Sequence, residues 1–304
     1  MRIDVHSHFN PPRLAEAGAH HWSGWVPVHP PDLNTRVDAM DAAGIDLQLL
    51  WPYVQPNFPN LAKSRDFARF TNDIYRELGV RYRGRFSGWG SIPLPHVDAA
   101  LAEIEYCLDD ARFLGIGLGC SAAAIPLDDP QFDPIWAELD RRRAAVFIHP
   151  GQVRSGMPGA TDYGLTLCLS SPMEIALASA RLVLSGVSRR YPNVKFILAT
   201  AGGMIPYVAD SIVEAARRHG SDLGGIDVRA GLADFFYDTS VGKDPGKLSR
   251  TCDLCGTSHI LFGTDAPYGD MASSVALVLD QFGVSDAEAI LNRNAHSVLC
   301  HVDP

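Results

Sequence analysis

Short apolar runs alternate along this chain with longer segments in which apolar residues return every three or four positions. A short apolar run between polar or glycine residues is typical of a buried parallel strand, and the longer spacing is typical of an amphipathic helix. Ala100, Leu101, Ile104 and Leu108 have that helical spacing. The apolar runs predict eight strands, at residues 3–5, 47–51, 86–92, 115–118, 145–148, 196–199, 235–238 and 260–262.

Eight strand–helix units with no internal repeat and no linker predict a single α/β domain, a (β/α)8 barrel over residues 1–304. A doubly wound open sheet is the alternative. That fold normally carries a glycine-rich fingerprint after its first strand, and none is present here. Two segments interrupt the alternation: a long loop over about 9–34, and a Gly- and Ser-rich stretch over 151–169 that we expect to form a lid.

One helix start is marked by a local motif. Ser171-Pro172-Met173-Glu174 has the pattern of a capping box with proline at the first helical position. The motif predicts a helix over 173–184 and gives Glu174 the role of the capping acid rather than a catalytic one.

Composition narrows the class of protein. The net charge of −9, with no basic stripe, argues against a nucleic-acid partner. No apolar run approaches the ~18 residues that span a bilayer, so no membrane partner is expected. The charged N-terminus is unlike a signal peptide, and the six scattered cysteines are typical of reduced thiols, so we expect a cytoplasmic protein. Cys252 and Cys255 form an isolated C-x-x-C pair, which is weak evidence for zinc or redox chemistry.

Ligand-type side chains stand at the ends of several predicted strands. The first strand ends in His6 and His8, two positions apart, so their imidazoles share a face about 7 Å apart. The fifth strand ends at His149 and the eighth at Asp265. Because the carboxyl ends of barrel strands meet at one mouth, these four side chains predict a site for one divalent metal ion.

The same residues carry a resemblance. The His-x-His motif, His149-Pro150 and Phe262-Gly263-Thr264-Asp265 resemble the amidohydrolase superfamily, and in particular the branch typified by 2-amino-3-carboxymuconate 6-semialdehyde decarboxylase. Further matches are Tyr82-Arg83-Gly84-Arg85-Phe86, Leu182-Val183-Leu184-Ser185-Gly186-Val187, Tyr191-Pro192-Asn193 and Asn294-Ala295. The resemblance implies a divalent metal held by His6, His8, His149 and Asp265, with zinc expected first and manganese or iron as alternatives.

One position departs from the branch. Its sixth strand usually ends in Ala-His-Gly-Gly-Gly, where the histidine is a general base or stabilises an oxyanion. Here the sequence is Ala199-Thr200-Ala201-Gly202-Gly203, and a threonine hydroxyl cannot take up a proton near neutral pH. Either another residue is the base, or the reaction needs none, or catalysis is lost. Asp265 is the best substitute, because the matching aspartate of hydrolytic relatives both touches the metal and accepts the proton of the attacking water.

Five further residues are candidates for contact with a substrate. Trp51 and Tyr53 follow the second strand and are expected to wall the pocket, although Trp51 also suits the core. His20 and His21 lie in the loop expected over the mouth. Either of them could replace the missing base, or both are surface or oligomer-contact residues. Arg154 lies in the expected lid. It could bind a substrate carboxylate with two hydrogen bonds, or it is exposed to solvent without a function.

These observations predict a metal-dependent carboxy-lyase or hydrolase that acts on a small carboxylate-bearing aromatic or unsaturated substrate. Because Thr200 replaces the histidine, two alternatives stay open: a divergent hydratase, cyclase or isomerase, or a binding protein that has lost catalysis. The expected partner is a small molecule, and a homodimer is left open.

Overall fold

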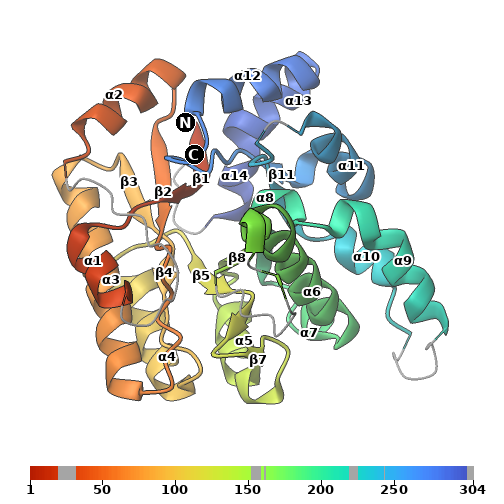
Figure 1. Ribbon diagram of the computed structural model, residues 1–304, viewed down its shortest axis with the longest axis horizontal. Coiled ribbons are helices and arrows are strands. Elements are labelled where there is room, and N and C mark those ends of the chain that lie inside the picture. Colours follow the sequence, from red (N-terminus) through yellow and green to blue (C-terminus); the bar gives the residue numbers. More distant parts are fainter. Residues whose placement is uncertain (20–31, 152–158, 161, 219–224, 243, 300–304) are drawn as a thin grey trace.

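The computed structural model describes residues 1–19, 32–151, 159–160, 162–218, 225–242 and 244–299. Parallel strands surround a buried centre and helices lie outside them (Figure 1). Following the chain, the barrel strands are β1 (Ile3–His8), β2 (Leu47–Trp51), β3 (Phe86–Gly88) with β4 (Gly90–Ser91), β5 (Ile116–Gly119), β8 (Ala145–His149), β9 (Lys195–Leu198), β10 (Phe236–Asp238) and β11 (Ile260–Leu261). A small hairpin, β6 (Ser121–Ala122) and β7 (Ile125–Pro126), follows β5.

Backbone hydrogen bonds close the ring of strands at two places. Trp89 N–H donates to Leu50 of β2 at 3.0 Å, and the next residue, Gly90, donates to Gly115 beside β5 at 2.9 Å, so β3 and β4 act as one strand. At the other seam, Val5 N–H donates to the Phe262 carbonyl at 2.9 Å. The predicted (β/α)8 barrel is therefore confirmed, with β1 extending to His8.

The helices are α1 (Pro12–Ala19), α2 (Asn34–Ala43), α3 (Leu61–Arg81), α4 (Val97–Glu105), α5 (Asp133–Arg141), α6 (Ser171–Leu184), α7 (Val187–Arg190), α9 (Ile205–Arg218), α10 (Val228–Ala233), α11 (Pro245–Cys255), α12 (Met271–Gln281), α13 (Val284–Glu288) and α14 (Asn294–Val298). Shorter helical turns are η1 (Tyr106–Asp110), η2 (Pro130–Phe132), η3 (Asp162–Gly164), η4 (Thr166–Ser170), α8 (Ala199–Gly202), η5 (Thr257–His259) and η6 (Ala289–Arg293). Ala100, Ile104 and Leu108 are buried on one face, as their spacing predicts.

Two segments expected as loops contain helices. α1 lies within the stretch after β1 because Leu14 packs into a small apolar cluster with Val54, Phe58 and Phe67. The expected lid contains η3 and η4.

The helix predicted over 173–184 is present as part of α6, but the predicted capping box is wrong. Ser170, the residue before α6, already has helical backbone angles, and its hydroxyl donates to the Ala160 carbonyl instead of capping the helix. η4 runs directly into α6, so Ser171 begins no new helix and has no free amide to cap. The Glu174 carboxyl instead accepts a hydrogen bond from the Gly151 backbone, and burial raises its pKa to about 7.

One helical stretch, Thr166–Leu184, has the length and apolar composition of a membrane span, contrary to the expectation from sequence. Ile175, Leu182 and Val183 on its inner side belong to the barrel core. A core helix of a soluble protein passes the same test, so the stretch is weak evidence for a membrane segment.

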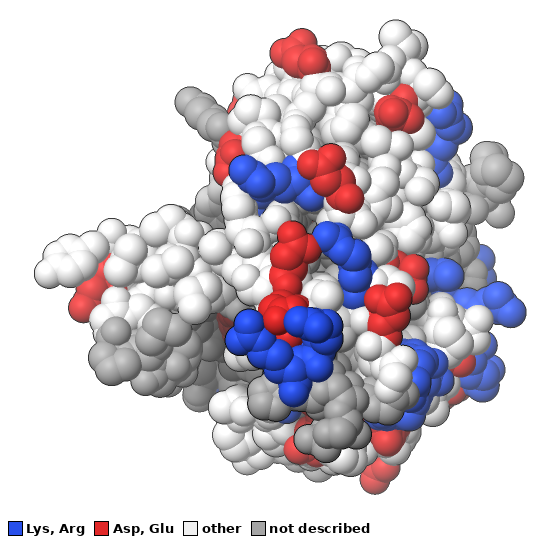
Figure 2. Space-filling model, turned by 90° about the vertical axis from the view of Figure 1, so that its right-hand side faces the viewer, with Lys and Arg blue, Asp and Glu red and all other residues white. Residues whose placement is uncertain are grey.

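Acidic and basic side chains lie next to one another on the face drawn in Figure 2. Arg217 and Arg218 both pair with Glu214 on α9, and Arg229 of α10 pairs with Asp210. Such exposed pairs each contribute little to stability. The absence of a nucleic-acid partner stays a prediction.

Candidate metal centre

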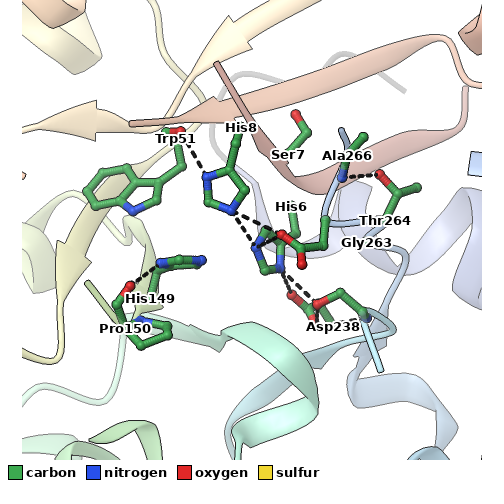
Figure 3. Close-up of polar contacts among 12 residues, drawn as sticks. His6, Ser7, His8, Trp51, His149, Pro150, Asp238, Gly263, Thr264 and Ala266 are labelled. Carbon is green, nitrogen blue, oxygen red and sulfur yellow. Dashed lines mark hydrogen bonds and ion pairs between the residues drawn. The ribbon is translucent and has the colours of Figure 1, made fainter. Parts of the chain in front are cut away.

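Three buried histidines meet at the carboxyl ends of the barrel strands. The Nε2 atoms of His6 and His8 are 3.2 Å apart, and the His149 ring centroid lies 4.9 Å from that of His6 and 4.8 Å from that of His8. Figure 3 shows the three imidazoles turned toward one another. Each of the three histidines offers one ligand atom, and these atoms all lie within 4.8 Å of one another, close enough to hold one ion. No other such group is found among the described residues.

Each imidazole is oriented by a partner at its other ring nitrogen. His6 Nδ1 lies 2.6 Å from Asp238 Oδ2 and 2.9 Å from Ser240 Oγ, and His8 Nδ1 lies 3.1 Å from the Trp51 carbonyl. His149 Nδ1 contacts the Pro150 carbonyl. When Nδ1 donates to an oxygen, the lone pair is left on Nε2, which is the arrangement that metal-binding histidines require. These residues therefore fit a divalent ion.

The protonation of the three rings differs. Burial lowers the pKa of His8 and of His149, so both are neutral at physiological pH. Burial also lowers the pKa of His6, but the carboxylates of Asp238 and Asp265 outweigh it and raise that pKa to about 9. Burial in turn raises the pKa of Asp238, but His6 outweighs this effect and the net shift is downward. The metal-free site therefore holds a His6 imidazolium beside an Asp238 carboxylate.

We expect the affinity for a divalent metal to rise with pH up to about 9, because the ion must displace the proton on His6. Below that pH, binding should release about one proton from this ring. Calorimetric titration of metal-free protein with Mn²⁺ in buffers of different ionisation enthalpy counts the protons. Asp238→Asn should lower the number released at pH 7.5. Proton release that is zero in the wild-type protein at this pH would contradict the assignment.

Asp265 lies beside His6 and His8 and comes from the loop after β11. Its Oδ1 lies 3.1 Å from His8 Nε2 and 3.3 Å from His6 Nε2, and the side chain is 41% exposed. The backbone of Asp265 is left-handed, with φ of 59°, and its N–H donates to the His6 carbonyl at 2.8 Å. The strained turn thus directs one carboxylate oxygen to the histidines while the group keeps contact with solvent.

A buried polar network ties together the two chain segments that carry His6, His8 and Asp265. The Asp4 carboxylate accepts hydrogen bonds from the backbone amides of His6 and Thr264 at 3.1 and 2.9 Å. Arg36 of α2 donates to the carbonyls of His8 at 2.6 Å and Ala266 at 3.4 Å. Gln48 joins the two, donating to Asp4 at 2.7 Å and accepting from Arg36 at 2.7 Å.

The end of β9 carries no charge. Thr200 and Ala201 both have left-handed backbones, with φ of 52° and 47°, and Thr200 is half-buried. The Ala201 amide donates to Asp238 Oδ1 at 3.1 Å, so this turn is tied to the partner of His6. A catalytic role for Thr200 stays a prediction, limited to hydrogen bonding by its hydroxyl.

Aromatic residues lie beside the histidines. Trp51 is buried, and a Cβ at Gly117 would lie 2.0 Å from its ring, so only glycine leaves room for the indole. The rings of Tyr53 and Tyr268 lie 6.4 and 5.6 Å from His8 and 6.3 Å from each other. Trp51 is therefore a core residue, and its role in contact with a substrate stays a prediction. His20, His21 and Arg154 lie outside the described residues.

Sequence reasoning missed Asp238, Ser240, Tyr268 and the network of Asp4, Arg36 and Gln48. Asp238 ends β10 just as His149 ends β8, so its place at a strand end was a usable signal. The cysteines of the C-x-x-C pair lie on α11, where burial raises the pKa of Cys252 to about 12. That shift makes the thiol unreactive.

Comparison with known proteins decides the family. The model of the family described as Amidohydrolase matches residues 3–299. The chain belongs to the amidohydrolase family. This membership confirms the predicted superfamily, and with it the prediction of a carboxy-lyase or hydrolase of that superfamily.

Curated relatives of this amidohydrolase are named as decarboxylases. The chain is 26% identical to 2-amino-3-carboxymuconate-6-semialdehyde decarboxylase of Dictyostelium discoideum, over 97% of this chain and 90% of that protein. It is 28% identical to 6-methylsalicylic acid decarboxylase of Penicillium expansum, over 88% of this chain and 85% of that protein. A dihydroxybenzoic acid decarboxylase of Polaromonas sp. JS666, solved with bound manganese and 2-nitroresorcinol, superposes with a TM-score of 0.85 at 21% identity, over 98% and 96%. The last likeness shows a shared fold.

Proposed function

We propose that this protein removes a carboxyl group from a small aromatic or unsaturated carboxylate, with a divalent metal ion held by His6, His8, His149 and Asp265. The observation that carries the proposal is the set of three buried imidazoles, each with Nδ1 engaged elsewhere, beside a solvent-exposed carboxylate. The named activities of the curated relatives favour decarboxylation over hydrolysis. Zinc is our first choice of ion, and manganese is the alternative because a structure of similar fold holds it.

A bound divalent ion would supply a Lewis acid that holds the substrate's oxygen atoms and withdraws electrons from them. In decarboxylation the bond between carbon and carboxyl breaks, carbon dioxide leaves, and the electron pair stays on the substrate carbon. That carbon must then receive a proton. We assign this transfer to the Asp265 carboxyl, which lies beside the histidines and, being 41% exposed, regains its proton from water.

Other side chains would position the substrate. The rings of Tyr53 and Tyr268 flank His8 and suit contact with a flat substrate. Among the described residues, the buried indole nitrogen of Trp51 has no hydrogen-bond partner, so it suits a substrate oxygen as acceptor. A small-molecule partner and a cytoplasmic location belong to the same proposal and rest on the sequence arguments given above.

The test is a substrate screen with protein loaded with zinc or manganese. The panel holds 6-methylsalicylate, 2,6-dihydroxybenzoate and 5-carboxyvanillate, together with aryl esters, anilides and lactones. Release of carbon dioxide that disappears after chelation and returns with metal is the expected result. Metal-dependent cleavage of the esters, anilides or lactones without carbon dioxide would replace the proposal with hydrolysis.

A further inference from the structure

Lys247 is a buried cation at the edge of the metal centre, and the chemistry described above does not use it. The residue is only 8% exposed. Lysine is almost never buried to this degree unless its ammonium is paired. Burial holds the pKa of Lys247 below its usual range, partly opposed by Asp238 and Asp244.

The fold places Lys247 above the end of β9. Lys247 and Thr251 lie four residues apart on α11, hence on one helical face, and the Thr251 hydroxyl is 3.4 Å from the Ala201 carbonyl. α11 begins after the carboxyl end of β10, so Lys247 lies one turn nearer the barrel mouth than Thr251. Side chains on a helix also tilt toward its N-terminus, here toward the mouth. The ammonium therefore lies on the side of the site where Thr200 offers no charge.

The nearest carboxylates are already occupied by other donors. Asp238 Oδ1 accepts from the amides of Ala201 and Ser240 and from the Ser240 hydroxyl, and its Oδ2 faces His6. Asp244 accepts from the backbone amide of Lys247 and from the Tyr207 hydroxyl. Across the described residues, the ammonium has no hydrogen bond and no carboxylate within 4 Å.

We propose that Lys247 binds an anionic oxygen of the substrate, from a carboxylate or a phenolate, on the β9 side of the three histidines. The inference rests on the proposed function and adds to it that the substrate carries an oxygen anion in this position. An ammonium that is carried by a mostly buried residue and has no carboxylate within 4 Å among the described residues forms a strong hydrogen bond with an anion. A mostly buried charge without a partner lowers the stability of the free protein. Residues of binding sites often lower stability in this way.

The experiment measures binding rather than turnover. Calorimetry gives the dissociation constants of 2,6-dihydroxybenzoate and of resorcinol for manganese-loaded wild-type protein, Lys247→Met and Lys247→Arg. Loss of a charged hydrogen bond should weaken binding to Lys247→Met by about 10- to 100-fold, with partial recovery in Lys247→Arg. Weakening confined to 2,6-dihydroxybenzoate identifies a carboxylate oxygen as the partner, whereas weakening of both ligands identifies a phenol oxygen. Lys195→Met, at the start of β9 and the opposite end of the barrel, is the matched control and should bind both ligands normally.

Two further readouts separate a binding role from a structural one. Metal content should be unchanged in Lys247→Met, and the melting temperature should stay equal or rise, because a buried charge has been removed. A lower melting temperature with unchanged binding would overturn the proposal in favour of a structural cation. Lys247→Gln replaces the methionine variant if that variant fails to fold. Wild-type protein that binds neither ligand and decarboxylates no substrate would overturn the proposed function and this inference together, whereas equal binding by wild type and variants overturns the inference alone.

Discussion

Asparagine in place of Asp265 is expected to lower the rate of decarboxylation by about 100-fold or more, while the protein still binds its metal ion. The amide keeps the shape of the side chain and one oxygen, but it cannot deliver a proton to carbon. We propose Asp265 as the acid for this step, because its Oδ1 lies 3.1 Å from His8 Nε2 and its side chain reaches solvent. The measurement is the steady-state rate of metal-loaded variant, with metal content determined on the same sample.

Asp280→Asn on the outer helix α12 is the matched control for this change, because that exposed carboxylate lies on the side of the helix that faces solvent. Its rate should equal that of the wild-type protein. A nearly unchanged rate in metal-loaded Asp265→Asn would move the proton transfer to another group, with His20 and His21 next in line.

The double variant His6→Ala, His8→Ala is expected to bind no divalent metal. The purified wild-type protein should carry about one ion per chain, and the change removes two of its three imidazole ligands. Elemental analysis of protein purified without a tag gives the metal content. Circular dichroism shows whether the barrel remains folded.

His259→Ala is the control for the loss of metal. This ring stacks on Phe236 at a centroid distance of 4.7 Å, at the start of β11 and so at the opposite end of the barrel from the histidine cluster. The variant should keep its ion. Stoichiometric metal in the His6, His8 double variant would show that the ion binds elsewhere.

The fold and the histidine cluster were predictable because both follow from local patterns. Fully buried parallel strands need continuous apolar runs, so β2 and β8 are visible as Leu47–Trp51 and Ala145–His149. Once the strands are assigned, barrel geometry brings their carboxyl ends to one mouth whatever the loops do. His6, His8 and His149 therefore meet although more than a hundred residues separate the last from the first two.

The capping box shows where a local pattern was insufficient. Its four residues have the right types and spacing, but a capping box needs a chain that enters the helix from a non-helical residue. η4 precedes α6 without a break, so the amides at Ser171 are already within a helix. The Glu174 carboxyl therefore caps no amide of α6 and instead accepts a hydrogen bond from the Gly151 backbone, in the loop after β8.

By itself the sequence determined the barrel, the positions of the candidate metal ligands and the absence of a histidine at the end of β9. Only the tertiary structure decided how those groups are charged and held. His6 pairs with Asp238, which is distant in the chain. The buried polar network of Asp4 and Arg36 also joins distant segments. The burial of Lys247 likewise depends on tertiary packing. The physical reason is that a pKa and a hydrogen bond depend on distances of a few ångströms and on local burial. The position of a residue along its strand fixes which end of the barrel its side chain occupies, whereas those distances are set by how the helices and loops pack around it.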